Sequence, residues 1–102
     1  MTDRELLELA AKAAGIKFSE IGGGARYAPQ PGIMQPYVPW NPLTDDGDAL
    51  RLAVKLGITI MFDRSSVWCE QYGVLEHHNE DPCAATRRAI VRAAADLGKG
   101  VA

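Results

Sequence analysis

The chain of 102 residues is predicted to form one α+β domain, in which three helices pack on a small antiparallel β-sheet. Two observations predict this class. Three amphipathic segments carry helix start and stop signals, and the stretches between them are rich in β-branched and aromatic residues. The expected order is helix, strand, a long loop with or without an edge strand, helix, two strands, helix.

The first predicted helix covers Asp3 to Ala14. Thr2 or Asp3 can cap its start, and Gly15 suits the left-handed turn that ends a helix. A short strand is expected from Ile16 to Phe18. Apolar residues at helical spacing predict the face of this helix that packs on the sheet: Leu6, Leu9, Ala10 and Ala13.

A segment rich in glycine, proline and aromatic residues follows at about residues 22–42 and is predicted to be a long loop. Five of the six prolines and a single charged residue, Arg26, lie between Ile21 and Pro42. A disordered linker would be more polar, so we expect an ordered loop, with an edge strand near Gln35–Trp40 as one option. Loops of this length are often functional, and the alternative is a loop that covers the core with its aromatic side chains.

The second helix is predicted to start with Thr44 as its N-cap, after Pro42, and to end at Gly57. Its first turn carries acidic residues, which the helix dipole favours there. The residues expected to face the core are Leu50 and Ala53, with either Ala49 or Leu52, and Leu56.

Two β segments are predicted next, and a hairpin is the simplest arrangement for them. The first runs from Ile58 to Asp63, and the second alternates from Val67 onward as one strand. The closing helix begins at Asp81, has Pro82 at its first position and ends at Gly98. Its predicted core face is Cys83, Thr86, Ile90, Ala94 and Leu97.

The stretch CEQYGVLEHHNEDPC, from Cys69 to Cys83, is the one cluster in the sequence with residue types suited to metal binding or thiol chemistry. Structural zinc sites use close ligand pairs, whereas these cysteines are far apart. His77 and His78 are adjacent, so in a strand they point to opposite faces. Cys83 at a helix start could be an activated thiol, but its predicted core position favours a small buried hydrophobe. We therefore expect no metal, no cofactor and two solvated histidines.

Composition excludes several classes of protein. The net charge of −2 argues against a nucleic-acid-binding protein, and no apolar run approaches the length of a membrane span. The N-terminus MTDRELLELA lacks the apolar region of a signal peptide. We therefore expect a cytoplasmic protein with reduced thiols.

The segment WNPLTDDGDALRLAVKL, the β segments after it and EDPCAATRRAIVRAAADLGK together resemble the phage ABA-sandwich domain of small tailed-phage and prophage proteins. The likeness covers about Trp40 to Lys99 well and the first helix loosely, and most of the glycine- and proline-rich loop at 22–42 has no counterpart in it. It implies helices around a small antiparallel sheet, and a phage gene product in the cytoplasm of the host bacterium. It brings no activity and no catalytic residues.

Binding to a host protein is the function that the sequence predicts, for example inhibition of a host defence system or of a host enzyme. The loop supplies the expected anchors: Tyr27, Ile33, Met34, Tyr37 and Trp40. The alternative is a small-molecule or nucleotide binder, with Arg26, the Gly22–Gly24 amides, Arg87, Arg88 and Arg92 as ligand-binding residues. A small enzyme is a third option, and the alanine-rich helix faces also allow a homodimer.

Overall fold

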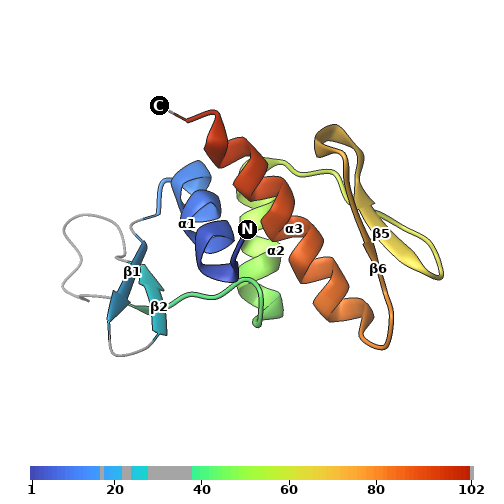
Figure 1. Cartoon of the computed structure of the whole chain (residues 1–102), viewed down its shortest axis with the longest axis horizontal. Helices are drawn as coiled ribbons and strands as arrows, with labels where there is room; N and C mark the ends of the chain where they lie inside the picture. Colours follow the sequence, from blue (N-terminus) through green and yellow to red (C-terminus); the bar gives the residue numbers. More distant parts are fainter. Residues whose placement is uncertain (17, 22–23, 28–37, 102) are drawn as a thin grey trace.

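The computed structural model of the chain describes residues 1–16, 18–21, 24–27 and 38–101 (Figure 1). Within these residues it has three α-helices and two three-stranded antiparallel sheets, with the element order α1-β1-β2-β3-α2-β4-β5-β6-α3. The predicted α+β class is confirmed, and the order of elements matches roughly, with three strands on each side of α2 where fewer were predicted. The strands form two separate sheets, whereas the sequence predicts a single one.

Helix α1 (Asp3–Ala14) begins and ends where the sequence predicts. The hydroxyl oxygen of Thr2 accepts a hydrogen bond from the backbone N–H of Glu5 at 3.2 Å, and Gly15 ends the helix in the left-handed conformation. The buried face is rotated from the predicted one, since Leu9 is only partly buried and Ala13 is half-buried. The residues that α1 buries are Leu6, Leu7, Ala10, Ala11 and Ala14.

Helix α2 (Asp46–Leu56) has Asp45 as its N-cap, which corrects the prediction of Thr44 by one residue. The Asp45 carboxylate accepts from the backbone N–H of Asp48 at 2.8 Å. Asn41 completes the cap, because its carbonyl oxygen accepts from the N–H groups of Thr44 and Asp45. Leu50, predicted to face the core, is exposed, and the buried residues are Ala49, Leu52 and Ala53.

Helix α3 (Pro82–Lys99) is the central element, and it packs against α1, α2 and the second sheet (Figure 1). Asp81 caps it as predicted, but the helix continues through Gly98. A Cβ atom at Gly98 would lie 2.0 Å from the carbonyl oxygen of Leu9 on α1. Gly98 is therefore a point where two helices approach closely, and the prediction that it ends α3 is wrong.

The first sheet has the strand order β1-β2-β3, formed by β1 (Phe18–Ile21), β2 (Gly24–Tyr27) and β3 (Val38–Pro39). The predicted strand at 16–18 therefore begins later and extends further. β3 is an edge strand at the end of the predicted Gln35–Trp40 segment, and an edge is where a proline such as Pro39 is tolerated. Residues 35–37 of that prediction lie outside the described residues.

The second sheet has the order β4-β5-β6, formed by β4 (Met61–Phe62), β5 (Ser66–Cys69) and β6 (Val74–His77). The predicted hairpin between β4 and β5 is present. The long second strand is wrong, because a 3₁₀ turn at Glu70–Tyr72 interrupts it and Gly73 reverses the chain in the left-handed conformation. The alternation toward the core ends at this turn.

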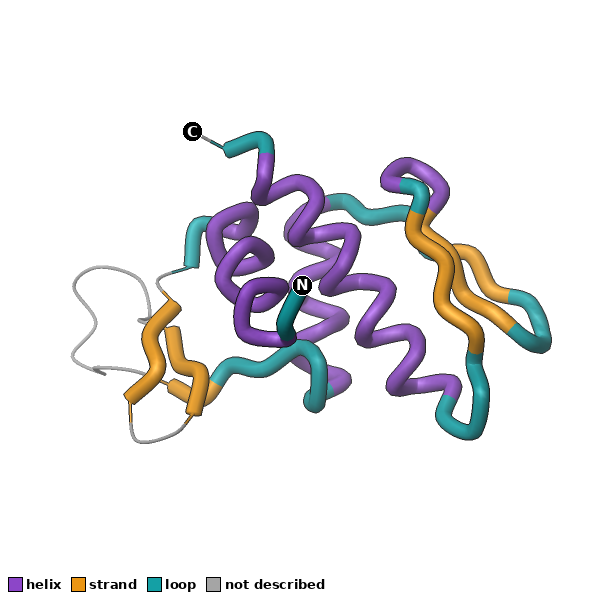
Figure 2. The backbone as a smooth tube through the Cα atoms, in the orientation of Figure 1, coloured by secondary structure: helices purple, strands orange, loops and turns teal. Residues whose placement is uncertain are grey.

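The two sheets lie at opposite ends of the helical layer (Figure 2). The core lies around α3 and is rich in alanine, which permits the close approach of α1. Trp40 is 4% exposed and belongs to this core. Its predicted role as a partner-binding anchor is therefore corrected: a side chain this deeply buried contributes to stability and has almost no surface to offer a partner.

Candidate protein-binding surface

The second sheet turns one face toward α3 and the other away from the helices (Figure 2). Val67 and Cys69 on β5 are fully buried, and Val74 opposite Cys69 on β6 is buried as well. Because side chains alternate along a strand, Trp68 must point to the opposite, outward face. This alternation assigns each strand residue to the inner or the outer face.

Three apolar residues form a row across the outward face, which we call the outer row: Met61, Trp68 and Leu75. Met61 pairs with Trp68, and Trp68 pairs with Leu75, so their side chains lie next to one another on the same face. Met61 is 41% exposed and Leu75 50% exposed, while Trp68 is half-buried. The outer row therefore presents one aromatic and two flexible aliphatic side chains to solvent.

The edge strand β4 adds a fourth exposed apolar side chain. Phe62 pairs with Val67, so it belongs to the inner face, yet it is 60% exposed. β4 therefore has an uncovered apolar residue on each of its two faces.

The turn that joins β4 to β5 is fixed by one carboxylate. Asp63 Oδ1 accepts hydrogen bonds from the backbone N–H groups of Ser65 at 2.8 Å and of Ser66 at 2.7 Å, and both hydroxyls lie 3.3 Å from it. The backbone hydrogen bonds from Ser65 and then Ser66 lower the pKa of Asp63 from its ordinary value of 3.8, which keeps this carboxylate ionised. The turn therefore has a defined shape and a negative charge.

The inner face is attached to α3 by a group of charges. Arg92 donates to the Glu76 carboxylate at 2.5 Å and to the carbonyl oxygen of Leu75 at 3.0 Å. Arg88 lies 3.9 Å from the same carboxylate and 3.1 Å from that of Asp3 on α1. These contacts hold β6 on the helical layer, so the outer row is carried by a fixed element.

Three of the arginines expected to bind a ligand already form hydrogen bonds or ion pairs with other residues of the chain. Arg87 donates to the carbonyl oxygen of Leu43 and to the Asp46 carboxylate, and its side chain is only 17% exposed. Arg88 and Arg92 are brought together, but on Glu76. An anion would have to compete with these partners, which weighs against the ligand-binding alternative. Arg26 belongs to β2, and the structure describes its backbone alone.

The structure does not test the other loop residues that were expected to anchor a partner. Ile33, Met34 and Tyr37 lie outside the described residues, and Tyr27 is described only by its backbone, in β2 opposite Val38. Their role in partner binding stays a prediction.

The cluster between Cys69 and Cys83 is split by the fold. Cys69 is buried, donates weakly to the carbonyl oxygen of Ala89 at 3.8 Å, and has its pKa raised by burial. Cys83 is exposed in the first turn of α3, so its predicted core position is wrong. Of the predicted solvated histidines, His77 is exposed, but His78 is half-buried and its Nε2 atom is buried without a hydrogen-bond partner. The described residues contain no group of three or more histidine, cysteine or acidic side chains arranged to hold a metal ion.

A pocket of about 220 Å³ lies where α1, β6 and the end of α3 meet. Its lining includes Met1, Tyr72, Arg92, Asp96 and Lys99. This volume is below the roughly 300–1,000 Å³ of typical small-molecule sites, so the pocket is a weaker candidate than the outer row.

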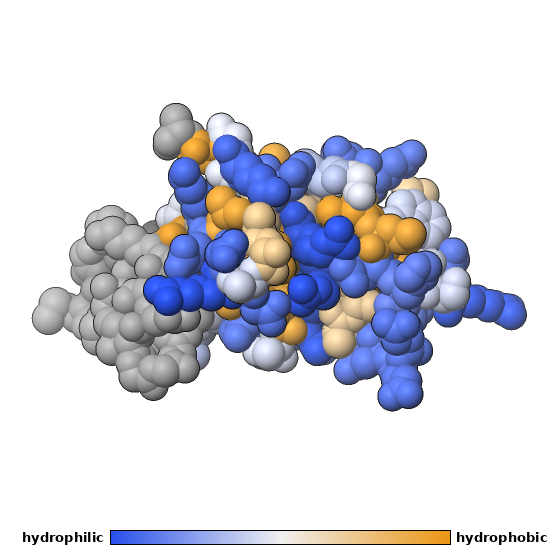
Figure 3. Space-filling view, viewed as in Figure 1, coloured by the Kyte–Doolittle hydropathy of each residue, from blue (hydrophilic) through white to orange (hydrophobic). Residues whose placement is uncertain are grey.

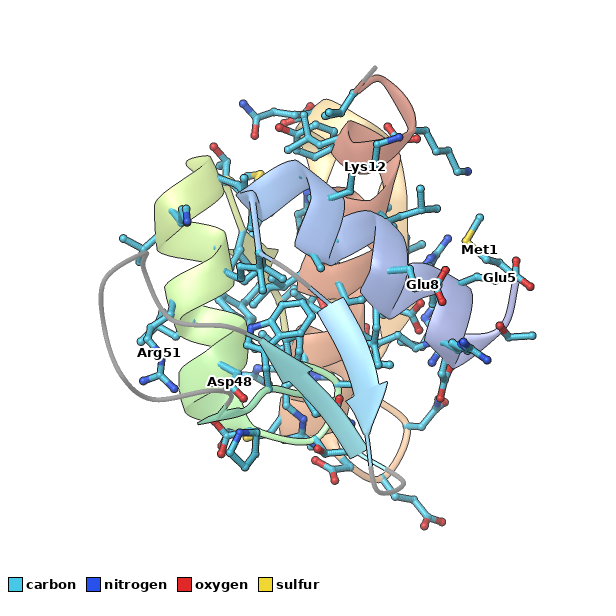
Figure 4. All side chains as sticks on the ribbon, turned by 90° about the vertical axis from the view of Figure 1, so that its left-hand side faces the viewer. Met1, Glu5, Glu8, Lys12, Asp48 and Arg51 are labelled. Carbon is cyan, nitrogen blue, oxygen red and sulfur yellow. The ribbon has the colours of Figure 1, made fainter. Side chains whose placement is uncertain are left out.

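Hydrophilic residues cover most of the described part of the face shown in Figure 3, and hydrophobic residues appear in small patches between them. Figure 4 shows Arg51 beside Asp48 on α2, with a 2.8 Å ion pair between them, and Glu5 and Glu8 on the opposite side of the molecule, on α1. Leu50 and Val54 are exposed on α2, one helical turn apart, and α2 lies away from the second sheet (Figure 1).

Comparison of the chain with protein-family models, curated proteins and solved structures found no match. The resemblance to the phage ABA-sandwich domain therefore stays a prediction. Several residues of the segment that carries it have structural roles, since Trp40 lies in the core and Asn41 and Asp45 cap α2. Within the described part of the chain, none of the helices combines the length and apolar character that a membrane crossing requires.

Proposed function

We propose that the chain acts by binding another protein through the outer row. The observation that carries this proposal is the row itself, in which three cross-strand neighbours on the sheet face opposite α3 are apolar and two of them are exposed. Exposed apolar residues that lie singly or in pairs, such as Leu50 and Val54 on α2, are ordinary, whereas larger contiguous apolar patches mark interaction sites, and the outer row extends across all three strands of its sheet.

The chemistry of the outer row suits a protein partner. Tryptophan and methionine are enriched at protein interfaces, where a few central side chains supply most of the binding energy. β5 and β6 are held to α3 by buried side chains and by the Glu76 ion pairs. A surface fixed in this way loses little conformational entropy on binding.

The setting proposed for this interaction is the bacterial host cell that the phage resemblance implies. A partner such as a host enzyme or a defence protein would be inhibited if this domain covered its functional surface. Such inhibition needs a complementary surface and no catalytic residues. We infer this setting from the resemblance alone, so it is tested separately from the location of the binding surface.

A capture experiment with matched variants tests the surface. The tagged wild-type chain, Leu75→Ser and the control Leu50→Ser are each incubated with bacterial lysate, and bound proteins are quantified by mass spectrometry. Both leucines are exposed, but Leu50 lies on α2 and Leu75 in the outer row. Circular dichroism confirms that each variant is folded.

We expect a protein that is retained by wild type and by Leu50→Ser but lost with Leu75→Ser. A protein retained equally by all three chains would locate the binding surface elsewhere. No specific capture from any bacterial lysate would contradict the proposed setting in a bacterial host.

A further inference from the structure

The outer row is bordered by acidic residues at both ends of the sheet. Glu70 follows the last residue of β5, while Asp63 and Glu80 belong to the turns at the other end, and all three are exposed. The two turns are adjacent, because the N–H of His78 donates to the carbonyl oxygen of Ser65 at 2.8 Å. Arg64 is the one lysine or arginine of the segment 58–81, which also contains His77 and His78.

The segment that carries the outer row is more acidic than the rest of the chain. It contains five aspartates or glutamates and one lysine or arginine, whereas the whole chain has 13 aspartates and glutamates and 11 lysines and arginines. The charge of Glu76 is neutralised by Arg88 and Arg92 on the inner face of the sheet, so it adds little to the electrostatic field at the outer row. The charges left around the outer row are therefore mainly negative, and Asp63 stays ionised because its carboxylate accepts hydrogen bonds from the backbone N–H groups of Ser65 and Ser66.

From this border we propose that the partner presents an apolar strip edged by lysine or arginine, such as a basic amphipathic segment of another protein. The proposal rests on the function proposed above and specifies its partner. Charge complementarity at the rim of an interface speeds association and excludes partners of the wrong charge. A second copy of this chain fits less well, because a symmetric contact would place the acidic border against itself.

Synthetic peptides test the charge preference without knowledge of the natural partner. The probes are a peptide of alternating leucine and lysine, its leucine–glutamate counterpart and its serine–lysine counterpart, all of one length. Nuclear magnetic resonance titration of the full chain follows the Trp68 indole N–H and the methyl groups of Met61 and Leu75. Trp40 is buried and acts as an internal reference.

We expect the leucine–lysine peptide to shift the outer-row signals and to bind about tenfold tighter than either counterpart. Adding salt should weaken this binding, since exposed charges are screened. Leu75→Ser and the double variant Glu70→Gln, Glu80→Gln should both weaken it. The controls Leu50→Ser and Glu5→Gln should leave it unchanged.

Three results would overturn the proposal. One is equal affinity for the lysine and glutamate peptides, and another is binding that leaves the Trp68 signal unchanged. The third is a wild-type dimer in sedimentation that Leu75→Ser dissociates, since this would make a second copy the occupant. If lysate capture depends on Leu75 but not on Glu70 and Glu80, only the charge preference fails. If capture does not depend on Leu75, the function proposed above fails as well.

Discussion

Asp63 is the residue whose ionisation is most closely tied to the shape of the second sheet. Its carboxylate accepts from two backbone N–H groups at the β4–β5 turn, and these hydrogen bonds lower its pKa from 3.8. A lowered pKa in the folded state stabilises the protein at pH values above the unfolded pKa. This contribution is lost as pH falls through 3.8 toward the folded value.

The first prediction concerns this pH dependence. Asp63→Ala should lower the melting temperature near neutral pH, because the turn loses its acceptor. The difference between wild type and Asp63→Ala should shrink as the pH falls from about 5 through 3.8, because the carboxylate then becomes protonated in the unfolded chain while its lowered pKa keeps it ionised in the folded one. Thermal unfolding across this range measures it, with the exposed neighbour Arg64→Ala as control. A difference that stays constant with pH would contradict the assigned hydrogen bonds.

The second prediction distinguishes the two cysteines. Cys83 is exposed, whereas Cys69 is fully buried and its pKa is raised by burial. A thiol reagent should therefore modify Cys83 quickly in the native protein and Cys69 only after unfolding. Mass spectrometry of labelled wild type and Cys83→Ser counts the modified sites. Rapid labelling of native Cys83→Ser would show that Cys69 is accessible and that the inner face of the sheet is open.

At the scale of elements, the close approach of α1 and α3 depends on small side chains. Ala89, Ala93 and Ala94 on α3 are fully buried, as is Ala10 on α1. The alanine-rich faces that allowed a homodimer are therefore used within the chain, which removes that argument for self-association. Gly98 is the closest point, because a side chain there would overlap the backbone of Leu9.

The third prediction uses two neighbouring glycines to test the close packing of α1 against α3. Gly98→Ala should destabilise the protein by about 1–3 kcal/mol, because the methyl group would force the helices apart. Gly100→Ala is the matched control: its new Cβ would meet the nearest atom at an ordinary 3.5 Å. Chemical denaturation measures both free energies of unfolding. Equal stability of the two variants would contradict the close crossing of α1 and α3.

The helix ends that the sequence predicts correctly are those set by residues close to them in the chain. Thr2 and Asp81 were identifiable as caps because a capping side chain needs only its own helix start. The prediction of Thr44 is wrong because the N-cap of α2 also depends on the hydrogen bonds around Asn41. Gly98 resembled a helix end in sequence, but its role is set by α1, which lies about 90 residues away in the chain.

The candidate surface was predictable only in part. Alternation along β5 placed Val67 and Cys69 on one face and Trp68 on the other, as the structure shows. The outer row needs the register of three strands as well, which long-range packing decides. Gly73 was the available signal that the second strand is broken, because a glycine inside a strand pattern often marks a turn or a bulge.

Across the whole molecule, stability and binding are assigned to different faces. The helices and the inner face of the second sheet form the core, and the outer row points away from it (Figure 2). A residue of a binding surface can be replaced at little cost in stability, whereas replacing a core residue lowers the free energy of unfolding strongly. The outer row is assigned to binding, and Trp40 is assigned to stability.

The fourth prediction compares these two roles. Leu75→Ser should cost about 0.2–1 kcal/mol of unfolding free energy, the range for a cross-strand pair. Trp40→Ala should cost about 3–5 kcal/mol, because it leaves a large cavity. Chemical denaturation of both variants measures the difference. A large loss with Leu75→Ser would make the outer row a structural feature and remove the reason to assign it to binding.

The most direct test of the proposed function is the affinity of the captured partner for three chains: wild type, Leu75→Ser and Leu50→Ser. Calorimetric titration of the purified partner supplies the three dissociation constants. Truncation of an interface anchor typically costs more than about 1 kcal/mol, so Leu75→Ser should weaken binding by roughly tenfold or more while Leu50→Ser matches wild type. Three equal dissociation constants would show that the partner binds elsewhere and would contradict the assignment of the outer row as the binding surface.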